Sequence, residues 1–131
     1  MGLMSLEMKQ IDLRLANFIE DTEEGTDYLI NGWRFAYRQR SISVDKYKQI
    51  SVRYTTRWGK DTEYHKILDG RFKALIYLFE FTDAMVVCCV SDIKDYLKSG
   101  KYDIVKNRDG SSGCYIKLSD IKHLLVRKES E

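Results

Sequence analysis

Two apolar runs that follow one another closely constrain the fold of this chain more than any other feature. The first is FKALIYLFEF, residues 72–81, and the second is AMVVCCV, residues 84–90. Each has the length of a strand, and only Thr82 and Asp83 separate them, so they predict two neighbouring strands. Strands that are apolar almost throughout lie centrally in a sheet and are covered on both faces. The runs therefore predict a sheet with helices packed against it.

A β-hairpin is predicted upstream, in DYLINGWRFAYRQR, residues 27–40. Asn31-Gly32 suits its turn, because a type I′ turn needs positive φ at both central positions. After the turn, three aromatic residues alternate with Arg34, Ala36 and Arg38. Alternation puts the two sets on opposite faces of a strand. We expect the aromatic side chains to pack into the core and the basic face to lie outside.

The remaining segments give an α+β order of elements. Apolar residues at spacings of three and four predict an N-terminal helix over residues 5–20. A third strand is predicted in YKQISVRYTTRW, residues 47–58, and a loop with a short helical turn in residues 59–70. A Ser-Asp pair predicts a helix start at Ser91 and again at Ser119, and Gly100 ends the first of these helices. The segment between them is predicted to be a hairpin with RDGSSG, residues 108–113, at its tip.

Together these elements predict one domain over residues 1–131, of the α+β class. Its sheet is expected to be mainly antiparallel or mixed, with five to seven strands and helices packed against it. The ends, residues 1–5 and 128–131, are expected to be flexible. Three cysteines, two of them adjacent in an apolar run, indicate reduced thiols and a cytoplasmic or other intracellular location. Since the apolar runs are too short to span a bilayer and no signal peptide is evident, we expect no membrane partner.

Positive charge is concentrated in one stretch of a chain whose net charge is only +2. Residues 33–60 contain eight Lys or Arg and one acidic residue, whereas residues 1–32 contain two basic and seven acidic residues. Lys and Arg gathered on one surface bind phosphate backbones. On the third strand, Arg53 and Arg57 share a face with polar residues that hydrogen-bond to phosphates or base edges. The predicted nucleic-acid-binding residues are Arg34, Arg38, Arg40, Lys48, Arg53, Arg57 and Lys60.

The layout of the predicted elements resembles the restriction-endonuclease-like fold of the PD-(D/E)XK superfamily. The resemblance rests on an N-terminal helix, a polar third strand and the run ALIYLFEFTDAMVVCCVSDIKDYL, residues 74–97. The family's catalytic strand carries acid-x-Lys, and the matching stretch ISVRYT places Ser51 and Arg53 there. Serine binds hard cations weakly, and arginine does not act in proton transfer. The resemblance implies that Asp45 matches the family's first acid and Glu20 its helix acid.

Three functions fit these observations, and the sequence leaves the choice among them open. The first is a nucleic-acid-binding protein, for DNA more than RNA, with a nuclease-like architecture and an incomplete catalytic motif. The second is a Mg²⁺-dependent endonuclease that uses Glu20 and Asp45, with Asp61 or Glu63 as further metal ligands. The third is a small interaction or inhibitor module of phage or plasmid type. A homodimer is expected through an exposed sheet edge or the acidic N-terminal segment. Because His65 and His123 lie far apart and no Cys-x-x-Cys occurs, spacing predicts no zinc site, and no cofactor is expected unless the chain is a nuclease.

Overall fold

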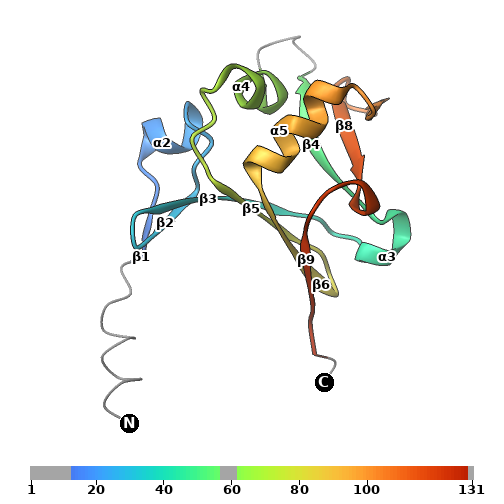
Figure 1. The fold of residues 1–131 in the computed structure, drawn as a ribbon, viewed down its shortest axis with the longest axis horizontal. Helices are drawn as coiled ribbons and strands as arrows, with labels where there is room; N and C mark the ends of the chain where they lie inside the picture. Colours follow the sequence, from blue (N-terminus) through green and yellow to red (C-terminus); the bar gives the residue numbers. More distant parts are fainter. Residues whose placement is uncertain (1–12, 57–61, 130–131) are drawn as a thin grey trace.

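A computed structural model describes residues 13–56 and 62–129 of the chain. The described residues form four α-helices, one short 3₁₀-helix and nine strands, which are arranged in two sheets (Figure 1). The predicted α+β class is therefore confirmed. The restriction-endonuclease-like arrangement stays a prediction.

The larger sheet, sheet A, is mixed and has six strands. Neighbouring strands are antiparallel except β3 and β5, which are parallel. The predicted hairpin is confirmed, with Asn31 and Gly32 at φ values of 50° and 81° in its turn. In spatial order the strands are β1 (Leu13–Leu15), β2 (Tyr28–Ile30), β3 (Trp33–Gln39), β5 (Ile76–Glu80), β6 (Ala84–Cys89) and β9 (Leu124–Arg127).

The smaller sheet, sheet B, consists of β4 (Gln49–Thr55), β8 (Ser112–Lys117) and β7 (Asp103–Lys106), all antiparallel. Strand β4 is the predicted third strand, and the hairpin predicted around residues 108–113 is β7 with β8. As its alternation predicts, β4 buries Ile50 and Val52, while Arg53 on its other face is exposed. Since β4 pairs with β8, the basic strand and the aromatic hairpin belong to different sheets.

The helices connect the two sheets through one core. They are α2 (Phe18–Thr22), α3 (Val44–Tyr47), α4 (Glu63–Asp69), α5 (Val90–Ser99) and the 3₁₀-helix η1 (Leu118–Asp120). Figure 1 shows α2, α4 and α5 on the same side of sheet A. Side chains from both sheets and both longer helices share the core, among them Tyr77, Ile116, Ile67 and Ile93. In the described part of the chain, no helix is long and apolar enough to cross a membrane.

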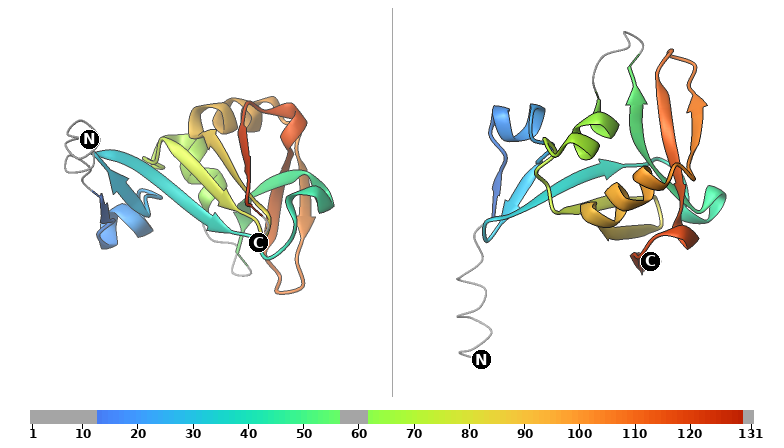
Figure 2. Two further views of the ribbon diagram at one scale, coloured as in Figure 1. Left: turned by 90° about the horizontal axis from the view of Figure 1, so that it is seen from below. Right: turned by 45° about the horizontal axis from the view of Figure 1, so that its top comes forward.

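The described residues cover only one face of sheet A, whereas β5 and β6 were predicted to be buried on both faces. Tyr77, Phe79 and Val86 point into the core and are fully buried, but Leu78 and Val87 point the other way and are partly exposed. Among the described residues, no helix or strand lies over that second face, as the view from below in Figure 2 shows. We call this second surface the open face; the cross-strand row Tyr37, Leu78, Val87 and Leu124 runs through its middle.

Strand β3 turns the opposite way from the prediction. Ala36 is fully buried and brings the arginines beside it toward the helices, whereas Trp33 is 56 % exposed on the open face. Ala36 is small enough to be fully buried on the helix side, and Arg34 and Arg38 pair there with Glu24 and Asp27. Alternation alone therefore identified the two faces of β3 but not which one is inside.

Two predicted helices are corrected by strand pairing. Within the predicted helix of residues 5–20, residues 13–15 form β1 and pair with β2, and Asn17 caps the short helix α2, which begins at Phe18. The part before Leu13 lies outside the described residues. The helix predicted from Ser119 is one 3₁₀ turn followed by β9, because Leu124 and Val126 pair with β6. The C-terminal end is held at Lys128, whose backbone N–H donates to the carbonyl of Asp83 at 2.9 Å.

Candidate functional site

An open cavity of about 540 Å³ lies where β3, β4, β8 and the start of α4 meet. Three arginines and one glutamate line it, which gives its lining a net charge of +2. We call it the arginine cavity. Its lining residues are Arg38, Arg40, Ser51, Val52, Arg53, Thr56, Thr62, Glu63, Asn107, Gly113 and Tyr115. The cavity thus joins residues that are far apart in the sequence.

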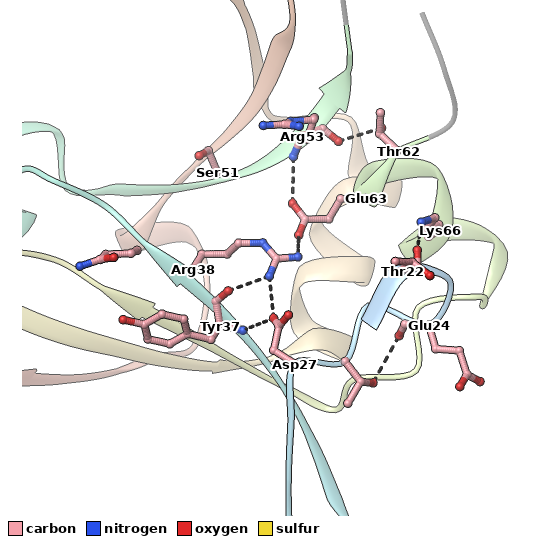
Figure 3. Close-up of polar contacts among 12 residues, drawn as sticks. Thr22, Glu24, Asp27, Tyr37, Arg38, Ser51, Arg53, Thr62, Glu63 and Lys66 are labelled. Atoms are coloured by element: carbon pink, nitrogen blue, oxygen red, sulfur yellow. Dashed lines mark hydrogen bonds and ion pairs between the residues drawn. The ribbon is translucent and has the colours of Figure 1, made fainter. Parts of the chain in front are cut away.

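Arg38 forms the inner wall of the cavity through a chain of ionic contacts (Figure 3). Its guanidinium donates to Asp27 Oδ2 at 2.9 Å and to Glu63 Oε2, and it lies 5.6 Å from the centre of the Tyr77 ring. Burial by itself would lower the pKa of Arg38, but its interactions with Glu63, Tyr77 and Asp27 together outweigh burial and raise that pKa. Arg38 is therefore fixed in place and fully charged.

Arg40 differs from Arg38 in having no carboxylate among the hydrogen-bond partners within the described residues. Its guanidinium donates to the carbonyl oxygen of Ser51 at 3.1 Å and to Ser51 Oγ at 3.3 Å, and it lies over the ring of Phe79. Burial lowers the pKa of Arg40, and the nearby charge of Glu63 opposes that shift only in part. A charged group removed from water is stabilised by an opposite charge, so this guanidinium is suited to an anion in the cavity.

Arg53 also lines the cavity. Its backbone makes hydrogen bonds that hold α4, and its side chain is exposed. Its N–H donates to Glu63 Oε1 at 3.0 Å, and its carbonyl accepts from the hydroxyl of Thr62 at 2.9 Å. These contacts fasten the start of α4 to β4 (Figure 3). Within the described part of the chain, no hydrogen bond or ion pair holds the Arg53 guanidinium, so it can move to meet a ligand.

A further wall of the cavity comes from the β7–β8 hairpin, whose Gly113 pairs with Arg53. It supplies the amide of Asn107, which donates to Ser111 Oγ at 3.1 Å, and the ring of Tyr115. Gly113 leaves room for that ring, since a Cβ at this position would lie 2.7 Å from Tyr115 Cε2. An amide and a tyrosine beside arginines are groups that hydrogen-bond phosphates and stack on bases.

The other predicted basic residues do not join this cavity. Arg34 pairs with Glu24 at 3.1 Å and lies 3.8 Å from Glu20, near α2. Lys48 lies at a separate cavity of about 390 Å³ beside α3 and β9. The predictions for Arg57 and Lys60 fall outside the described residues. The structure therefore brings together Arg38, Arg40 and Arg53, three of the seven.

Glu20, the first predicted catalytic acid, has a structural role at the start of α2. It completes a capping box with Asn17, accepting from the Asn17 N–H at 3.0 Å while its own N–H donates to Asn17 Oδ1. Arg14 donates to both carboxylate oxygens, at 2.8 and 3.0 Å. The hydrogen bonds from Arg14 and from the Asn17 backbone lower the pKa of Glu20 to about 2. Both oxygens of the Glu20 carboxylate therefore already accept hydrogen bonds at the start of α2.

A pH experiment tests this role of Glu20. Because its pKa is lower in the folded than in the unfolded chain, Glu20 stabilises the fold above about pH 4.3, the ordinary glutamate value. That contribution is lost as the pH falls toward about 2. Glu20→Gln should therefore lower the urea midpoint at neutral pH, and its difference from the wild type should shrink in acid. Glu23→Gln, which removes an exposed carboxylate of the same segment, is the control. A difference that stays constant with pH would contradict the assignment.

Asp45, the second predicted catalytic acid, lies far from Glu20, at the other end of the structure in α3 (Figure 1). Arg127 donates to both of its carboxylate oxygens at 2.9 Å, and these hydrogen bonds lower its pKa. The two acids thus stand in different ion pairs. Among the described residues, no group of three His, Cys, Asp or Glu side chains is arranged to hold a metal ion. Asp61 lies outside those residues, and Glu63 is held by Arg38 and Arg53.

Sequence reasoning missed several residues of the arginine cavity. Asn107, Gly113 and Tyr115 reach it only because β8 pairs with β4, across more than fifty residues of chain. Asp27 was not recognised as the partner of Arg38, although the acidic and basic segments of the sequence stand side by side in the structure. That reversal of charge between residues 1–32 and 33–60 was the signal that could have indicated ion pairing.

Comparison with known proteins identifies no family for this chain. No protein-family model matches the sequence, and no curated protein or solved structure shows significant similarity to it. Support for a function therefore lies in the chemistry of the arginine cavity and in the charge pattern of the sequence.

Proposed function

We propose that the protein binds nucleic acid, with a phosphate of the backbone entering the arginine cavity between Arg40 and Arg53. One observation carries the proposal: Arg40 is partly buried and has no carboxylate hydrogen-bond partner among the described residues, in an open cavity of net positive charge. A phosphate oxygen is a charged acceptor that the fork of a guanidinium binds strongly. Arg38 is neutralised by Asp27 and Glu63, so Arg40 and Arg53 supply the binding charge.

The predicted third strand supports the same proposal from the sequence. Ser51 and Arg53 stand where the resembled nucleases carry their acid and lysine, and both line the arginine cavity. A hydroxyl and a guanidinium bind phosphate oxygens but do not complete a metal site. The protein is thus proposed to be a nucleic-acid-binding relative of nuclease-like architecture, with DNA preferred to RNA and without a complete catalytic motif.

The salt dependence of binding tests this proposal. Anisotropy of labelled DNA, single-stranded or duplex and about 20 nucleotides long, would be measured between about 50 and about 200 mM salt. Binding should weaken as salt rises. Arg53→Gln should weaken it further and reduce the slope of log K against log salt by about 0.7 for single strands or about 0.9 for duplex. Arg53 is the residue to change because its side chain is exposed and does not hold the fold.

Lys98→Gln is the matched control, because Lys98 is an exposed cation in the last turn of α5, outside the arginine cavity. It should leave both affinity and slope unchanged. Failure of the wild type to bind either form of DNA, or RNA, at about 50 mM salt would overturn the function. Equal effects of Arg53→Gln and Lys98→Gln would show that binding is not centred on the arginine cavity.

A further inference from the structure

The open face of sheet A is apolar across all six strands. Residues paired between neighbouring strands point to the same side of a sheet. One such row is Tyr37, Leu78, Val87 and Leu124, and Leu15 and Trp33 extend the same surface toward β1. None of the residues on this face belongs to the core that unites the two sheets. The surface is therefore a second apolar layer without a described partner.

Exposure of this face is large for a protein in water. Leu15 is 71 % exposed, Leu124 61 % and Trp33 56 %. Among the described residues of its six strands, one carboxylate lies on this face: Glu80, at the end of β5, where it accepts from the Tyr37 hydroxyl and from Lys128 Nζ. The middle of the face is thus free of charge, and an apolar patch of this extent marks an interaction surface.

The size of the open face is of the order that a stable dimer interface needs. Six strands about 4.8 Å apart, each contributing about five residues of about 3.3 Å, cover roughly 480 Å² in projection. Side-chain relief makes the accessible area larger than the projection. Stable protein interfaces bury about 800 Å² on each partner, so the face is of the right order to be one half of such an interface.

We propose that the open face packs against the same face of a second copy of this chain. Two sheets would then lie about 10 Å apart as a symmetric β-sandwich. A two-fold dimer needs a surface that is complementary to itself, and an uncharged apolar face meets that requirement without like charges in opposition. This arrangement would cover β5 and β6 on their second face, as their apolar sequences predict.

The dimer is independent of the proposed function but has a consequence for it. Arg38 points to the side of β3 opposite the open face, because it shares the side of the buried Ala36. The two arginine cavities of a dimer would therefore face away from the interface. A pair of sites on one particle binds a long polyanion more tightly than either site alone.

Sedimentation equilibrium tests the dimer directly. The wild type should have about twice the chain mass of 15.4 kDa at micromolar concentration. The double variant Trp33→Glu with Leu124→Glu should be monomeric, since both side chains are exposed in the single chain and carry no core contact. The control is Ile104→Glu on sheet B, which is 47 % exposed and should leave the mass unchanged. A wild-type monomer, or a dimer that persists in the double variant, would overturn the proposal.

Trp33 fluorescence gives a second test of the dimer, and this test requires no substitution in the proposed interface. In the Trp58→Phe protein, Trp33 is the sole tryptophan. Its emission should move to shorter wavelength as the concentration rises through the dimer range, because its exposed ring becomes buried. Emission that stays constant while the mass doubles would place the interface elsewhere, for instance at a sheet edge, and would also overturn the proposal. Loss of DNA binding with a retained dimer would affect only the proposed function.

Discussion

The Gly25→Ala substitution is expected to lower the free energy of unfolding by about 3 kcal/mol. Gly25 has a φ of +67°, and a Cβ built there would lie 2.2 Å from Cε1 of Phe72. Phe72 is itself buried and stacks on Tyr77 at a centroid distance of 5.3 Å. Because Tyr77 in turn stacks on Phe79, displacement of the Phe72 ring would disturb the centre of the core.

The loss of stability at Gly25 has two causes, the left-handed backbone conformation and the clash with Phe72, and Gly70→Ala measures the first cause alone. Gly70 also has a positive φ, +85°, but an added Cβ meets nothing within 4 Å. It should therefore show only the backbone cost of the left-handed conformation, about 1 kcal/mol. Urea unfolding of both variants, followed by circular dichroism, measures the difference. Equal losses would mean that the Phe72 ring moves aside freely and that the region around Gly25 is loosely packed.

Local sequence signals predicted the parts of the fold that local contacts determine. Asn31-Gly32 gave the hairpin of β2 and β3, and Gly100 ended α5 as expected. The predictions were wrong where pairing with a strand distant in the sequence determines the local structure. Residues 13–15 carry apolar residues that fit a helix, but pairing with β2 makes them a strand. In the same way, Leu124 and Val126 form a strand because they pair with β6.

Burial was the least predictable property of the strands. The aromatic face of β3 has the greater apolar area, yet its Ala36 face is the buried one. The choice depends on Asp27 and Glu63, which hold Arg38 on the helix side and come from other elements. The alternation of β3 therefore indicates its two faces, and contacts with other elements of the chain accompany the burial of the Ala36 face.

Part of the candidate site could be predicted, because it lies within one basic stretch of the sequence. Arg38, Arg40 and Arg53 were expected to bind together, and all three line the arginine cavity. They meet across two sheets rather than on neighbouring strands, since β4 pairs with β8. That long-range pairing, which no local pattern in the sequence indicates, also brings in Tyr115, whereas Lys48 lies at a separate cavity.

The Arg38→Met substitution is expected to lower the free energy of unfolding by about 3 kcal/mol. Methionine keeps much of the apolar stem but leaves the Glu63 carboxylate, whose side chain is 10 % exposed, without its cationic partner. A buried charge that loses its partner is strongly destabilising. The contact also joins β3 to α4, so the variant should unfold at a lower urea concentration, measured by circular dichroism.

Arg127→Met provides the control for Arg38→Met, since Arg127 and Asp45 form a two-bond ion pair in which each side chain is 53 % exposed. Exposed pairs contribute little, so its loss should stay below about 1 kcal/mol. The double variant Arg38→Met with Glu63→Met should recover part of the stability lost in Arg38→Met, because the nearly buried Glu63 carboxylate is then absent. Asp27, whose side chain is 26 % exposed, keeps the hydrogen bond from the Tyr37 N–H. If the double variant recovers nothing, the stability comes from the packing of the guanidinium over Tyr77, and the ionic chain from Glu63 to Asp27 is not what holds the two sheets together.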